Sequence, residues 1–99
     1  MKIIIHAPWE VNETMEGLIR TKIEKLLKYE SHIQKADVYL KNGEGESITD
    51  KNVEVRLKTN YNEIFAQDTA AELEVALAEA VAKAKRQLIK RKDKLQAHH

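Results

Sequence analysis

The chain has 99 residues, 42% of them hydrophobic and 33% charged, which is typical of one folded domain with a well-solvated surface. The absence of cysteine excludes a disulfide scaffold, a cysteine-based zinc site and a thiol nucleophile, and no apolar run suits an export signal or a membrane span, so we expect a cytoplasmic protein. The net charge of +1 says little about partners, but residues 83–94 hold seven of the 17 basic residues and one of the 16 acidic ones, leaving −5 elsewhere.

The first half of the chain predicts a strand and then an amphipathic helix. Residues 2–6, KIIIH, are β-branched and bounded by Pro8, which favours a short buried strand. Over residues 11–30 the apolar period changes to three and four, with Asn12 as the expected N-cap. The predicted buried stripe of this helix consists of Met15, Leu18, Ile19, Ile23, Leu26 and Leu27.

The second half predicts three strands and a long helix. Residues 36–41 and 53–58 alternate between apolar and polar side chains, and 63–67 form the last expected strand. The polar loop at 42–52 connects the first two. From Thr69 or Ala70 to Lys94 no glycine or proline interrupts a helical pattern. Its predicted buried stripe is Leu73, Leu77, Ala80, Val81, Ala84 and Leu88.

The expected fold class is α+β, in the order β-α-β-β-β-α, with two helices packed on one face of a four-stranded sheet. The other face of the sheet is expected to stay in water. We expect a single domain over residues 1–95, with 96–99 as a disordered tail or the remnant of an expression tag. Nothing on the exposed helix faces demands a dimer, so we expect a monomer in isolation.

Residues suited to catalysis do not assemble along the sequence. None of the four histidines stands one helical turn from another histidine. Glu72 and Glu74 point to different faces of a helix, and the GEGE run at 43–46 is acidic, so it would repel a phosphate. We therefore expect a protein that is not an enzyme, with no metal, no cofactor and no small-molecule substrate.

The first helix separates its charges onto two flanks. Glu16, Arg20 and Glu24 are spaced for an ion-pair ladder on one flank. The opposite flank carries Lys22, Lys25 and Lys28, with no acidic residue beside them along the helix. For this helix alone, a solvated flank with cations suited to the helix dipole is a better explanation of the pattern than a binding site.

The last helix carries more positive charge than its dipole requires. The dipole effect is confined to the last turn and is worth about 0.3–1 kcal/mol per surface charge. The cations here extend over some three turns and repel one another at i, i+4, which indicates an external anion. The candidate binding residues on this helix are Lys83, Arg86, Lys90 and Lys94.

Two basic flanks on neighbouring helices predict a surface for structured RNA. If both helices cover one sheet face, Lys22, Lys25 and Lys28 would border the cations of the last helix across a groove. Few exposed aromatic residues are expected, so recognition would depend on RNA shape and phosphate charge. A general double-stranded RNA-binding module and a protein-interaction module that regulates transcription are the alternatives.

Three segments resemble the ribosome hibernation-promoting factor family, also called ribosome-associated inhibitor A or sigma-factor modulation protein. They are KIEKLLKYESHI at 22–33, ADVYL at 36–40 and the basic segment KAKRQLIKRKDK at 83–94, near the end of the last helix. The resemblance covers about residues 2–94. It implies a fold similar to a double-stranded RNA-binding domain.

The resemblance also implies a function and a set of contacts. Such a protein binds the small ribosomal subunit near the decoding region, blocks mRNA and tRNA, silences translation under stress and preserves idle ribosomes. Its partner is the ribosomal RNA. The contacts implied on this chain are Lys22, Lys25, Lys28, Lys83, Arg86, Lys90 and Lys94.

The chain departs from the family pattern early in the last helix. Family members commonly have Asp-Met/Leu-Tyr-x-Ala-Ile-Asp where this chain has ELEVALA at 72–78, so Glu74 stands in place of the tyrosine. Ala80 and Ala84 are smaller than usual, which predicts a helix that sits close to the sheet. No second domain of the kind that joins two ribosomes in long members is expected, so dimerisation of ribosomes by this chain alone is not expected.

Overall fold

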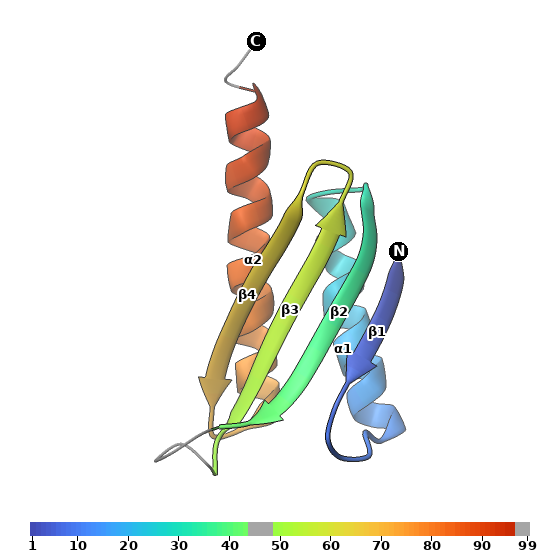
Figure 1. The fold of residues 1–99 in the computed structure, drawn as a ribbon, viewed down its shortest axis with the longest axis vertical. Helices are drawn as coiled ribbons and strands as arrows, with labels where there is room; N and C mark the ends of the chain where they lie inside the picture. The colour runs from blue at the N-terminus through green and yellow to red at the C-terminus, as the bar shows by residue number, and fades with distance from the viewer. Residues whose placement is uncertain (44–48, 97–99) are drawn as a thin grey trace.

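The structure is a computed structural model that describes residues 1–43 and 49–96, with only the backbone described over 92–96. Its elements are β1 (Lys2–His6), α1 (Glu13–Glu24), the 3-10 helix η1 (Lys25–Lys28), β2 (Ile33–Asn42), β3 (Lys51–Thr59), β4 (Glu63–Ala70) and α2 (Leu73–Gln96). This order confirms the predicted β-α-β-β-β-α fold. Both helices lie on the same face of one sheet (Figure 1).

The sheet has the strand order β1-β2-β3-β4. Strand β1 runs parallel to β2, because α1 crosses over between them, and β2, β3 and β4 follow as antiparallel neighbours. The registers place Ile3 beside Ala36, Val38 beside Val55, and Leu57 beside Ile64. All of these side chains face the helices, so the alternating pattern of the strands builds the floor of one core.

The core joins that sheet face to the two helices. Ile19 and Ile23 of α1 and Leu26 of η1 are fully buried, as is Leu77 of α2. α2 also contributes small side chains that are completely inaccessible to solvent, namely Ala76, Ala80 and Ala84. Small residues let a helix backbone approach its neighbour closely, and α2 lies against both β3 and β4. The predicted buried stripes thus face the core, although five of their residues are only half-buried, namely Met15, Leu18, Leu27, Leu73 and Val81.

The helix ends explain where the basic residues stand. The Asn12 side chain accepts a hydrogen bond from the Met15 amide at 2.8 Å, which caps α1 as predicted. The α-helix ends at Glu24 and tightens into η1, so Lys25 and Lys28 occupy a 3-10 turn. α2 begins at Leu73 rather than Thr69 or Ala70, because β3 holds the longer β4 as far as Ala70.

α2 has 24 residues, enough in length to span a bilayer. However, α2 is too highly charged to cross a membrane. No helix in the ranges 1–43 and 49–96 is both long and apolar enough to do so.

The face of the sheet away from the helices is less open than predicted. Glu54 of β3 is only 5% exposed, although its position in the alternating pattern indicated a solvated side chain. Lys41 and Arg56 cover it, with nitrogen to carboxylate oxygen distances of 3.3 and 3.0 Å. Arg56 in turn lies over the rings of Tyr39 and Phe65, each at 5.4 Å. Ion pairs and aromatic rings from neighbouring strands therefore bury a carboxylate on this face.

A second carboxylate on this face is Asp37 of β2. Its oxygens lie 2.9 Å from Nε2 of His6 and 3.4 Å from Nζ of Lys35. Burial acts to raise the pKa of Asp37, but the hydrogen bonds and charges of His6 and Lys35 outweigh it, so the pKa lies below its ordinary value.

Candidate nucleic-acid interface

The first group of predicted cations follows α1 into η1. Lys22 is half-buried, and Lys25 and Lys28 are exposed. None of the three forms an ion pair with a side chain that the structure describes. The other flank of α1 is neutralised, because Arg20 lies 3.2 Å from Glu16; Glu24 adds no ion pair to this predicted ladder.

The cations of α2 point in three directions. One set lies along the edge of the sheet, where long side chains of α2 donate to carbonyl oxygens of β4. The bonds run from Lys83 to Gln67 at 3.1 Å, from Gln87 to Phe65 at 2.7 Å and from Arg91 to Glu63 at 3.2 Å. The Lys83 ammonium also lies 3.1 Å from the Asp68 carboxylate. Lys83 is therefore on the β4 flank of the helix, away from α1.

Lys85 makes the link to the first helix. Its Nζ lies 4.9 Å from the centre of the Tyr29 ring, directly after η1. This cation–π contact joins the basic end of the first helix to the basic part of α2. On α2, the cation that contacts the end of the first helix is therefore Lys85 rather than the predicted Lys83.

The third direction is toward solvent. Arg86 and Lys90 are exposed and form no ion pair with any side chain among the described residues. Lys94 belongs to the backbone of α2, but its side chain lies outside the described residues, so its contact stays a prediction. We define the basic surface as the following six residues: Lys22, Lys25, Lys28, Lys85, Arg86 and Lys90.

The basic surface has little that would neutralise it. None of its six cations has an acidic partner among the described side chains, and one of them, Lys85, lies over an aromatic ring. Unpaired cations on neighbouring helices repel one another, and an external polyanion relieves this repulsion. The sequence of α2 contains no aromatic residue, so this helix presents no aromatic ring for base stacking.

The different positions of Lys83 and Arg86 predict different effects on stability. Lys83→Met removes a partly exposed ion pair and a hydrogen bond to β4, so the free energy of unfolding should fall by about 0.5–1.5 kcal/mol. Arg86→Met removes no described contact and should change it by less than about 0.5 kcal/mol. Urea unfolding of both variants measures this. Equal losses would contradict the separation of the two side chains.

The partner of Lys83 predicts a pH dependence. The pKa of Asp68 lies below its ordinary value of 3.8, first because the Thr69 amide donates to its carboxylate at 2.8 Å and then because of Lys83. A lowered folded pKa stabilises the protein fully above the unfolded pKa, and this stabilisation is lost as pH falls through the folded pKa. As the pH falls below about 4, the free energy of unfolding, measured in urea, should therefore decrease less in Asp68→Asn than in the unaltered protein. Identical acid dependence in both proteins would remove Asp68 from this role.

The remaining acidic and histidine side chains bear on the predicted absence of a metal site. No group of three potential metal ligands occurs within the described ranges. His32 donates from its backbone amide to Glu30 at 2.9 Å, and its ring Nδ1 lies 3.1 Å from the same oxygen. In the acidic 43–46 run, residues 44–46 lie outside the described residues.

Comparisons with known proteins identify the fold. A ribosomal subunit interface protein from Coxiella burnetii superposes with a TM-score of 0.81 at 17% identity, covering 94% of this chain and 99% of that chain. The N-terminal domain of Thermus thermophilus Protein Y superposes with a TM-score of 0.76 at 18% identity, covering 91% and 98%. At these identities the likeness establishes the fold alone. No curated protein gives a significant sequence match.

The family is established by the sequence itself. The model of the family described as Sigma 54 modulation protein / S30EA ribosomal protein matches residues 3–96. The match includes both helices and the sheet from Ile3 onward, and it confirms the family resemblance found in the three sequence segments. The chain belongs to the Sigma 54 modulation protein / S30EA ribosomal protein family.

Proposed function

We propose that this protein binds the small ribosomal subunit near the decoding region and prevents mRNA and tRNA from binding there. Translation is silenced in the cytoplasm under stress, and idle ribosomes are preserved. The protein acts by occupying space, without catalytic turnover. The observation that carries this proposal is the basic surface, with five unpaired cations distributed over α1, η1 and α2.

The distribution of these charges favours RNA as the partner. Each cation that approaches a phosphate releases condensed counterions, so several together produce affinity with a strong dependence on salt. Tyr29 is half-buried and its ring is covered by Lys85, which leaves the surface without an aromatic platform for single-stranded bases. Recognition of a folded RNA by its shape and phosphates is the mode that remains.

The proposed contacts are the predicted ones with two changes: one predicted residue becomes a minor contact, and one residue is added. Lys22, Lys25, Lys28, Arg86 and Lys90 are free to bind phosphates, and Lys94 is proposed with them. Lys83 would have to leave Asp68 and Gln67 first, so we propose it as a minor contact. Lys85, beside Tyr29, joins the set.

Competition between small subunits and a plain RNA duplex tests the choice of partner. A molar excess of an A-form duplex at low salt should not displace labelled protein from small subunits. Equal affinity for both would instead assign the chain to general structured-RNA binding. Binding that is insensitive to RNase and to moderate salt would indicate a protein-interaction regulator.

Blocking of tRNA is tested by filter binding. Small subunits loaded with mRNA should retain less labelled tRNA as the protein is added. The retained tRNA should fall to half near the protein concentration at which half of the subunits have bound the protein. Retention of tRNA on subunits saturated with the protein would contradict the occlusion mechanism while leaving ribosome binding intact.

A further inference from the structure

The two edges of the sheet differ in how their main-chain groups are satisfied. Along β4, three carbonyl oxygens accept hydrogen bonds from the α2 side chains of Lys83, Gln87 and Arg91. An edge covered in this way cannot pair with another strand. The polar ends of these three side chains are thus used to cover the main chain of β4 from Glu63 to Gln67.

The β1 edge has no such cover. Strand β1 pairs only with β2, and no described side chain forms a hydrogen bond with its main chain. In a strand that pairs on one side, the N–H and C=O groups of alternate residues point outward. Another extended backbone satisfies such a row of donors and acceptors with matched spacing.

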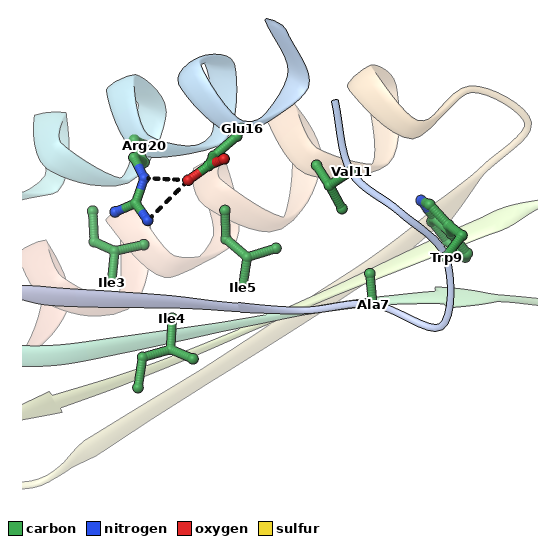
Figure 2. A pocket seen from close by; sticks show the side chains of 8 residues that line it. All are labelled: Ile3, Ile4, Ile5, Ala7, Trp9, Val11, Glu16 and Arg20. Carbon is green, nitrogen blue, oxygen red and sulfur yellow. Dashed lines mark hydrogen bonds and ion pairs between the residues drawn. The ribbon is translucent and has the colours of Figure 1, made fainter. Parts of the chain in front are cut away.

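A cavity lies beside this open edge, between β1 and α1. Its volume is about 420 Å³, within the range of binding pockets. Ile3 and Ile5 point into it from β1, whereas Ile4 points to the other side of the strand (Figure 2). Ala7, Trp9 and Val11 line the end that follows the strand, and the Glu16–Arg20 ion pair borders it from α1.

The cavity and the edge fit one kind of occupant. We propose that the β1 edge binds an extended peptide as a fifth strand, with an apolar side chain of the peptide inserted between β1 and α1. Side chains of an added strand alternate between the two faces, so every second one would project over the cavity. The others would lie on the far face beside Lys2, Ile4 and His6. His6 is already paired with Asp37, but Lys2 is exposed and has no ion pair among the described side chains, which favours one acidic residue opposite Lys2.

A second copy of the chain fits less well. Two β1 strands paired edge to edge would bring Ile3 and Ile5 of both copies together. In each copy Ile3 and Ile5 already line that copy's own cavity, so they cannot also insert into the cavity of the other copy. The site also lies on the flank of α1 opposite Lys22 and Lys25, so it is independent of the proposed ribosome contacts.

A designed peptide tests the proposal directly. The probe is acetyl-Glu-Val-Thr-Leu-Thr-Val-Glu-amide, and its binding is followed by amide chemical shifts of the full chain. We expect shifts over residues 2–7 and in α1 near Arg20. Two control peptides carry methyl groups on alternate amide nitrogens, each blocking one edge of the peptide. One control should lose at least tenfold in affinity, and the other should bind as the probe does.

Variants of the chain separate this site from its surroundings. Ala7→Leu should fill the cavity and weaken probe binding at least tenfold without lowering the melting temperature. Val75→Leu, an exposed position on α2 that does not line the cavity, should leave binding unchanged, as should Lys25→Glu combined with Arg86→Glu.

Three results would overturn the proposal. They are an absence of shifts in β1 at millimolar probe, equal binding of both methylated peptides, and broadening of β1 signals with protein concentration before any peptide is added. The last result would assign the edge to a second copy of the chain.

Discussion

Glutamate at positions 25 and 86 together should release the protein from small ribosomal subunits. Each reversal removes a charge-assisted contact worth about 1.5–3 kcal/mol, so the loss of affinity should reach at least about 100-fold. Lys25 and Arg86 are exposed and unpaired among the described side chains, so thermal stability should hardly change. Co-sedimentation with purified subunits at low salt measures the binding.

The matched control changes the same net charge on the other face of the sheet. Lys2→Glu combined with Lys58→Glu alters two exposed cations, one on β1 and one on β3, and neither belongs to the basic surface. This variant should keep most of its affinity. If both double variants lose binding equally, net charge rather than the basic surface accounts for it. If Lys25→Glu with Arg86→Glu still co-sediments, the proposed surface is wrong.

Leucine in place of Ala80 should strongly destabilise the fold. Ala80 is fully buried where α2 lies against the sheet, so leucine would force three more carbon atoms into a packed interior. Overpacking of this kind costs about 1–3 kcal/mol, which lowers the melting temperature by about 5–20 °C in a domain of this size.

Ala78→Leu is the control for this substitution. Ala78 is exposed on the same helix, and leucine and alanine differ little in helix propensity. Its melting temperature should stay within a few degrees of the unaltered protein. Comparable melting of the two variants in differential scanning calorimetry would contradict the close packing of α2 on the sheet.

The element order and the core were predictable because both depend on local periodicity. The alternation at 53–58 and the i, i+3, i+4 pattern around Ile19 and Ile23 each select one buried face without knowledge of the rest of the chain. Asn12 gave the start of α1 for a similarly local reason, since its side chain caps a residue three positions on.

The exact membership of the basic surface was not predictable in this way. Lys83 and Lys85 are two residues apart, and whether each faces β4 or α1 depends on how α2 docks. One signal was available: Lys83, Gln87 and Arg91 repeat at four-residue intervals with long donor side chains, as suits a helix flank beside a sheet edge. The burial of Glu54 required knowledge of Lys41 on another strand, which alternation does not supply.

Sedimentation of the protein with small ribosomal subunits through a sucrose gradient tests the central claim most directly. At low salt the protein should migrate with the subunits, and it should return to the top of the gradient as salt is raised, because phosphate contacts carry the affinity. Protein that remains at the top at low salt, with intact subunits in excess, would contradict the account.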